Sequence, residues 1–151
     1  MTQSLSTLAA ILVGATLFLS TPGYADEAEV DQQIEALLGD PGTFRSTIAE
    51  LQRRVANEDS IAVSAFISYP ITVSINGMRK TLRQAEDLEE YYGDIFTPDI
   101  VEVILSQDYG SLFVNSDGVM FGNGEVWMSA VCLDDGCAEV EAQIIAIQTV
   151  E

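Results

Sequence analysis

The sequence of 151 residues contains no histidine, and its 6 lysine and arginine residues face 24 aspartate and glutamate residues. The formal charge of −18 excludes nucleic acid and anionic membrane surfaces as partners, because both are polyanions. Without histidine, and with only 2 cysteines, the chain lacks the usual ligand set of a transition-metal site, so we expect no metal or other cofactor. The charge suits either solubility alone or attraction to a basic partner.

The apolar run from Leu8 to Leu19 has 12 residues, which is too short to cross a bilayer and typical of the core of a signal peptide. Gly23 and Ala25 follow as the small residues of a cleavage site. The segment has no lysine or arginine, so a retained N-terminal anchor remains an alternative. We expect a signal peptide over residues 1–25, a periplasmic or secreted bacterial protein, and no membrane attachment after cleavage.

The two cysteines, Cys132 and Cys137, enclose the turn sequence Leu-Asp-Asp-Gly. In an oxidising compartment this arrangement predicts a disulfide that staples the two ends of a hairpin. A loop this short removes little chain entropy, so we expect the bond to add only about 1–2 kcal/mol of stability. Redox catalysis usually requires Cys-x-x-Cys, and the spacing here is longer.

After the signal segment we expect a flexible acidic stretch over residues 26–40 and a single domain over residues 41–151. The domain begins with a helix, because Asp40 is a typical N-cap and Pro41 suits the first helical position. An apolar stripe follows at spacings of four and three residues, which indicates one buried helix face; it consists of Phe44, Ile48, Leu51 and Val55.

A second group of elements follows in the middle of the chain. Asn76-Gly77 is the strongest short hairpin signal and joins two predicted strands, 71–75 and 78–82. Thr81 and Gln84 have the spacing of a capping box, which predicts a helix after them. Thr97, followed by proline, predicts the start of another helix.

The C-terminal part is predicted to be a sheet. Asp117-Gly118 favours a type I′ turn between two apolar strands. Gly122 and Gly124 are interpreted as a bulge that bends one long strand, with Trp127 just beyond the bend. A last strand is expected over residues 138–150. Strands grouped after helices indicate an α+β fold, with N-terminal helices packed on a curved, mostly antiparallel sheet.

Three stretches carry a family resemblance: Phe66–Val73, Tyr91–Phe96 and Gly118–Trp127. With them the chain resembles the nuclear-transport-factor-2-like (SnoaL-like) superfamily, and more closely its small exported bacterial members, over residues 43–150. The resemblance implies a cone-shaped fold with a pocket between sheet and helices, which relatives use for catalysis, ligand binding or assembly. It also makes a homodimer possible. Fold alone does not determine which of these functions applies.

From these observations we expect a non-enzymatic exported binding module. Its concave pocket or open sheet face would bind a small apolar ligand or an envelope protein, since an apolar pocket with few polar groups is the default binding site. The residues expected to line it are aromatic: Tyr69, Tyr92, Phe96, Phe113 and Trp127.

Two other functions remain open. A small lyase- or isomerase-like enzyme would use a pocket carboxylate as general base, with Glu125 as the first candidate and Asp117 and Asp94 behind it. Glu125 can equally accept hydrogen bonds from main-chain amides freed at the glycine-rich bend. An acidic inhibitor or immunity protein that blocks a basic enzyme is the third possibility.

Overall fold

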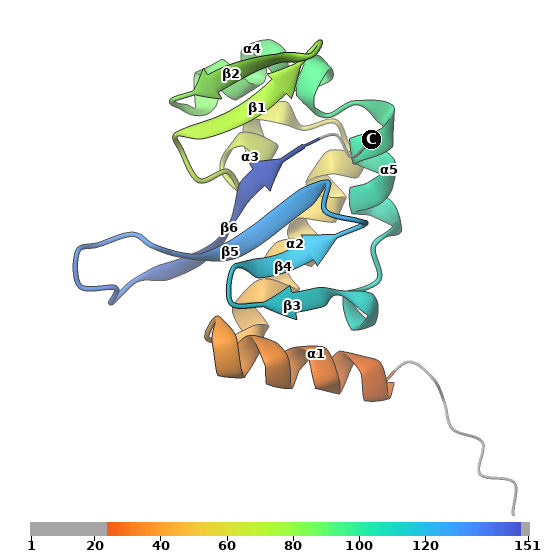
Figure 1. Ribbon diagram of the computed structural model, residues 1–151, viewed down its shortest axis with the longest axis vertical. Helices are drawn as coiled ribbons and strands as arrows, with labels where there is room; N and C mark the ends of the chain where they lie inside the picture. The colour runs from red at the N-terminus through yellow and green to blue at the C-terminus, as the bar shows by residue number, and fades with distance from the viewer. Residues whose placement is uncertain (1–23, 149–151) are drawn as a thin grey trace, which may run out of the picture.

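The computed structural model describes residues 24–148, with side chains from residue 26 onward. The predicted signal segment therefore lies outside the described residues up to position 23, as do residues 149–151. The fold is α+β, as predicted, with helices preceding an antiparallel sheet (Figure 1). In chain order the elements are α1 (Tyr24–Leu37), α2 (Pro41–Ala56), α3 (Ser60–Ser64), β1 (Ile71–Ile75), β2 (Met78–Leu82), α4 (Ala85–Ile95), α5 (Pro98–Ser106), the 3₁₀ helix η1 (Tyr109–Ser111), β3 (Phe113–Asn115), β4 (Gly118–Phe121), β5 (Val126–Cys132) and β6 (Val140–Ile147).

The strands form two antiparallel sheets. β3, β4, β5 and β6 are neighbours in that order, and β1 pairs with β2. The residues just before β1 lie along the free edge of β6, where Ser68 donates a main-chain hydrogen bond of 2.9 Å to Ile144 and Ile144 donates one of 2.7 Å to Phe66. The predicted hairpin at Asn76-Gly77 is confirmed, and both residues have the positive φ that its turn requires (51° and 77°).

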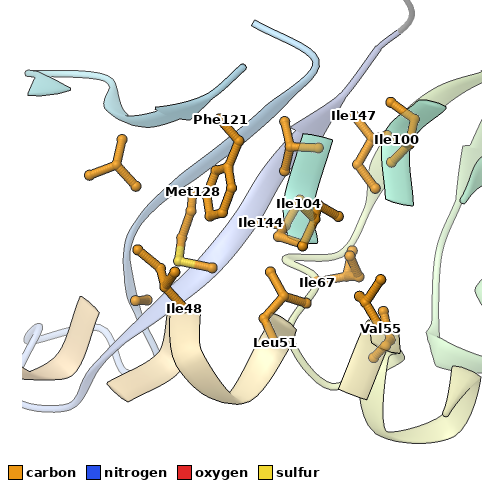
Figure 2. Close-up of a cluster of buried hydrophobic side chains, with 14 of the residues drawn as sticks. Ile48, Leu51, Val55, Ile67, Ile100, Ile104, Phe121, Met128, Ile144 and Ile147 are labelled. Atoms are coloured by element: carbon orange, nitrogen blue, oxygen red, sulfur yellow. The ribbon is translucent and has the colours of Figure 1, made fainter. Parts of the chain in front are cut away.

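The hydrophobic core lies between the four-stranded sheet and the helices α2 and α5 (Figure 2). All four residues of the predicted α2 stripe are buried. Figure 2 shows side chains from α2 and α5 packed against side chains from β4, β5 and β6 between the layers. The pocket that we expected between sheet and helices is therefore replaced, in this region, by direct packing. The core residues labelled in the figure are Ile48, Leu51, Val55, Ile67, Ile100, Ile104, Phe121, Met128, Ile144 and Ile147.

The glycine-rich stretch after β4 reverses the chain, which corrects the prediction of one long bent strand. Gly122 and Gly124 both have positive φ (62° and 115°), and they lead β4 into β5 as its antiparallel neighbour, with Val119 opposite Met128. Two closely spaced left-handed residues suffice to turn a chain back on itself. The irregularity in the sheet lies instead in β6, where the register shifts so that Ile145 has no partner.

The turn between β3 and β4 also differs from the prediction. A type I′ turn needs positive φ at both central residues. Because Asn115 pairs with Gly118, the central residues are Ser116 and Asp117, and neither has positive φ. The side chain of Asn115 organises the turn instead, since its Oδ1 accepts hydrogen bonds from the amides of Asp117 (2.8 Å) and Gly118 (3.2 Å). This is the local side-chain bonding that asparagine offers in turns.

Residues 26–40, expected to be flexible, contain most of α1. Val30 and Ile34 are buried, and the helix packs against η1 and β3. Ion pairs of 2.6 Å and 2.9 Å join Arg45 of α2 to Glu27 and Asp31 of α1. The helix is thus stabilised by contacts with distant parts of the chain, which the local sequence of residues 26–40 did not indicate.

The helix starts agree with the prediction at two of three places. Asp40 accepts a hydrogen bond of 2.8 Å from the Thr43 amide, and Thr97 caps α5. The capping box before α4 is wrong, because Thr81 belongs to β2 and Gln84 makes no side-chain capping bond. None of the helices between residues 24 and 148 combines the length and the apolar character needed to cross a membrane.

Candidate functional site

A surface groove of about 630 Å³ is the best-formed candidate site in the described part of the chain. It lies where the C-terminal end of α2 and the start of α3 meet α4 and α5, and we call it the α4–α5 groove. Its lining is mostly apolar and aromatic, with few polar groups. The lining residues are Val55, Ala56, Glu58, Ser60, Tyr92, Gly93, Phe96, Pro98, Val101 and Leu105.

Helix α5 builds one wall of the groove because it is apolar on two sides. Ile100 and Ile104 are buried in the core. Val101 and Leu105 directly follow these two residues in the sequence and are four residues apart. They line the groove, and Leu105 is 42% exposed. Residues four apart lie on the same helix face, so a second apolar stripe remains uncovered beside the first.

Helix α4 contributes the aromatic wall. Tyr92 and Phe96 are also four residues apart, and their rings stack with centroids 4.7 Å apart and planes inclined by 12°. The Tyr92 hydroxyl oxygen is buried and has no hydrogen-bond partner within residues 24–148. Burial raises the pKa of this phenol, and the negative charges of Glu58 and Asp59 raise it further.

The polar side of the groove follows directly after α2. Glu58 and Ser60 line it, and between them Asp59 accepts a 3.0 Å hydrogen bond from Arg54. Glu58 has a left-handed backbone, with φ of 54°. A carboxylate and a hydroxyl group therefore stand beside an apolar wall.

The five aromatic residues predicted to line one pocket do not lie together in the structure, and only two of them line the α4–α5 groove. Tyr92 and Phe96 line the α4–α5 groove. Tyr69 lies elsewhere and donates a 3.2 Å hydrogen bond to the main-chain oxygen of Ser64. Phe113 and Trp127 meet edge to face, with ring centroids 6.4 Å apart.

Phe113 and Trp127 lie on the outer face of the sheet, opposite to the face that packs on α2 and α5. Both are opposite Met120 in the strand register, and they alternate with the buried residues of the inner face. Phe113 is 52% exposed. The outer face therefore carries a row of apolar side chains that is separate from the α4–α5 groove.

The three carboxylates considered as general bases lie on different elements. Glu125 stands in the turn between β4 and β5, where its Oε2 accepts a 2.6 Å hydrogen bond from the Asn123 amide. Asp117 is exposed in the turn between β3 and β4, at the other end of β4, and Asp94 is exposed on α4. Within residues 24–148, no three acidic or cysteine side chains gather as a metal site would require. The bond from the Asn123 amide to Glu125 is of the kind foreseen as the alternative to catalysis.

The predicted disulfide between Cys132 and Cys137 is confirmed, with Cα atoms 4.8 Å apart. It closes the tip of the β5–β6 hairpin. Asp134 organises the same tip, since its carboxylate accepts hydrogen bonds from three amides: Gly136 at 2.8 Å, and Ala138 and Glu139 at 3.0 Å each. These bonds lower the pKa of Asp134, with that from Ala138 having the largest effect.

Sequence reasoning missed two parts of the groove, the α5 wall and Glu58. The four-residue spacing of Val101 and Leu105 could have predicted a second apolar stripe on this helix. No local sequence pattern identified Glu58 as a groove residue. Comparison of the chain with protein-family models, with curated proteins and with solved structures finds no match.

Proposed function

We propose that this chain is an exported, non-enzymatic binding module and that its α4–α5 groove binds a small apolar ligand. The observation that carries the proposal is the groove itself. Its volume of about 630 Å³ falls in the range of small-molecule sites, and such sites share its character of apolar walls with a few polar groups. The stacked rings of Tyr92 and Phe96 supply a rigid aromatic wall.

Export is supported by two independent features. The apolar segment within residues 1–25 has the length of a signal-peptide core. The disulfide between Cys132 and Cys137 suits an oxidising compartment, where such bonds persist. Both features fit a periplasmic or secreted protein.

Membership of the nuclear-transport-factor-2-like superfamily is part of the proposal. The order of elements supports it: helices, a hairpin, further helices, and then a four-stranded antiparallel meander. The proposed site differs from the sheet pocket that the resemblance implied, because side chains of α2 and α5 fill the space under the sheet.

A second candidate is that the outer face of the sheet binds an envelope protein. It is favoured by an apolar row of the exposed Phe113 and the half-buried Met120 and Trp127. The groove is preferred because it is concave and can remove most of a ligand from water. An enzymatic role gains no support from Glu125, whose carboxylate is engaged by the Asn123 amide.

The groove can be blocked at Gly93. A Cβ atom built there meets no atom within 4 Å, and Gly93 lines the groove, so we expect a leucine at this position to be tolerated and to fill part of the groove. We expect the full-length chain to bind the neutral fluorescent probe N-phenyl-1-naphthylamine. The Gly93→Leu variant should bind it at least about tenfold more weakly, since a leucine replaces ligand contacts.

The matched control is Ala36→Leu, which adds a leucine at an exposed position of α1. It should bind the probe as the wild type does. Equal binding by the wild type and Gly93→Leu would rule out the groove as the site. Loss of binding in Trp127→Ser, with Gly93→Leu unaffected, would favour the outer face of the sheet.

A further inference from the structure

Glu58 is the one charged residue among those that line the α4–α5 groove. In the described part of the chain its carboxylate has no hydrogen bond or ion pair. The arginine nearest in sequence, Arg54, is already engaged, since it bonds to Glu50 at 2.7 Å and to Asp59 at 3.0 Å. All 6 basic residues of the protein precede residue 84, so α4 and α5 bring none to the other walls. The groove is therefore apolar, with one exposed carboxylate in its lining that no basic residue of the described chain pairs with.

The backbone conformation of Glu58 is one in which a glutamate is unexpected. Glu58 has a left-handed φ of 54° and lies just after the end of α2. There the Glu58 amide donates a 3.0 Å hydrogen bond to the Val55 carbonyl group, and the Asp59 amide donates one of 3.1 Å to the Arg54 carbonyl group. Glycine is the usual residue in this conformation at the end of a helix, because a Cβ atom destabilises it. Glu58 is exposed and its side chain makes no contact that offsets this cost, so the carboxylate is free to bind a ligand.

We propose that Glu58 is the counter-ion for a positively charged head group, so that the ligand of the groove is a small amphipathic cation. Such a ligand has an ammonium or guanidinium group on an apolar body. This inference rests on the proposed function of the groove and names the chemical class of its ligand.

Three features of the site support a cation over other head groups. The carboxylate of Glu58 stands beside the apolar wall that would hold the body of the ligand. Tyr92 and Phe96 line the same groove, and aromatic rings attract cations through their negative faces. The charge of −18 on the whole chain raises the local concentration of cations and lowers that of anions. An anionic head group would instead lie beside Glu58 and be repelled.

The test compares three probes with the same apolar chain and different head groups. Octyltrimethylammonium, octanol and octanoate are titrated into the full-length protein by calorimetry, below their micelle-forming concentrations and at low salt. We expect the cation to bind about three- to tenfold more tightly than the alcohol, as a partly exposed ion pair contributes that much, and octanoate to bind most weakly. Salt should reduce the advantage of the cation.

Glu58→Gln should lose most of the preference for the cation over the alcohol and keep only the part that comes from the aromatic rings and the net charge. Glu35→Gln is the matched control, because it removes the same charge from an exposed position on α1. It should keep the preference for the cation. Equal loss of preference in both variants would show that only the net charge matters and would overturn the role of Glu58.

Glu58→Gly separates a binding role from a structural one. Because glycine relieves the left-handed backbone, this variant should unfold at a higher denaturant concentration than the wild type and still lose most of its preference for the cation. A lower unfolding midpoint would show that the Glu58 side chain serves the fold, against our inference.

The two proposals fail in distinguishable ways. If octanol binds and Gly93→Leu blocks it, but the cation binds no more tightly, Glu58 is not a counter-ion and the groove remains an apolar site. If none of the three probes binds, both proposals fail.

Discussion

The Tyr109 hydroxyl group donates a 2.8 Å hydrogen bond to Oδ1 of Asp31, although the two residues are 78 positions apart in the sequence. Arg45 joins the same cluster, because it bonds to Asp31 at 2.9 Å and its guanidinium group lies 4.1 Å from the centre of the Tyr109 ring. Burial, followed by the bond to Asp31, raises the pKa of Tyr109. The cluster ties α1 to α2 and η1, and it explains why a segment expected to be flexible is an ordered helix.

Removing this hydroxyl group should therefore weaken the attachment of α1. We expect Tyr109→Phe to lower the free energy of unfolding by about 1–2 kcal/mol, because a hydrogen bond to a carboxylate is lost. Urea denaturation followed by circular dichroism measures the change. Tyr91→Phe is the control, since the Tyr91 hydroxyl group makes no hydrogen bond in the described structure, and it should change stability little. Equal effects of the two substitutions would contradict the role of the Asp31 bond.

Gly118 and Gly93 should respond in opposite directions to alanine. A Cβ atom at Gly118 would overlap the main-chain oxygen of Met128, and the φ of 149° is itself unfavourable for alanine. We expect Gly118→Ala to lower stability by at least about 2 kcal/mol. Gly93 lies within α4 with open space around its Cβ position, so Gly93→Ala should raise stability by about 0.5–1 kcal/mol. Differential scanning calorimetry gives both values, and a stable Gly118→Ala protein would show that β4 and β5 can separate at this point.

Glu125 should prove structural when it is substituted. Its hydrogen bond to the Asn123 amide holds the β4–β5 turn, so Glu125→Ala should lower the free energy of unfolding by about 1–2 kcal/mol. The fluorescence of Trp127, which is the single tryptophan and lies two residues away, reports the unfolding. Asp117→Ala removes an exposed carboxylate from the neighbouring turn and should change stability by less than about 0.5 kcal/mol. Unchanged stability in Glu125→Ala would reopen a catalytic role for this residue.

Tyr69 should make the protein sensitive to alkaline pH. Burial raises the pKa of Tyr69 to about 12, and the charges of Asp87, Glu89 and Glu86 add to the effect. The folded pKa lies above the unfolded value of about 10, so the stabilisation is complete below pH 10 and is lost as the pH rises towards 12. Urea midpoints measured from pH 9 to pH 12 should fall more steeply for the wild type than for Tyr69→Phe. The same slope in both proteins would count against a buried, neutral Tyr69.

Local chemistry explains the elements that were predicted correctly. Asp40 and Pro41 define the start of α2 through bonds within a few residues, and the apolar spacing defines its buried face. Asn76-Gly77 adopts the one turn type for which this pair is suited. The bond from Cys132 to Cys137 joins neighbours on a hairpin. In each case the interaction partners are close in sequence, so the pattern is sufficient.

The errors occurred where the same local pattern permits two structures. A glycine with positive φ can occur in a β-bulge or in a turn that reverses the chain. Only the pairing of β4 with β5 determines that Gly122 and Gly124 form a turn. The bulge in β6 left a trace in the sequence, since the buried residues Ile144 and Ile147 are three apart instead of two.

The amino-acid sequence by itself determined the α+β class, the main helix, the β1–β2 hairpin and the disulfide, because these depend on short-range geometry and on apolar periodicity. Tertiary structure alone decided that α1 is docked through Asp31 and Tyr109. It also decided that Tyr92 and Phe96 form one site while Phe113 and Trp127 lie on another face. A groove is made by the ends and sides of helices far apart in the chain, and their relative placement depends on how the whole core packs.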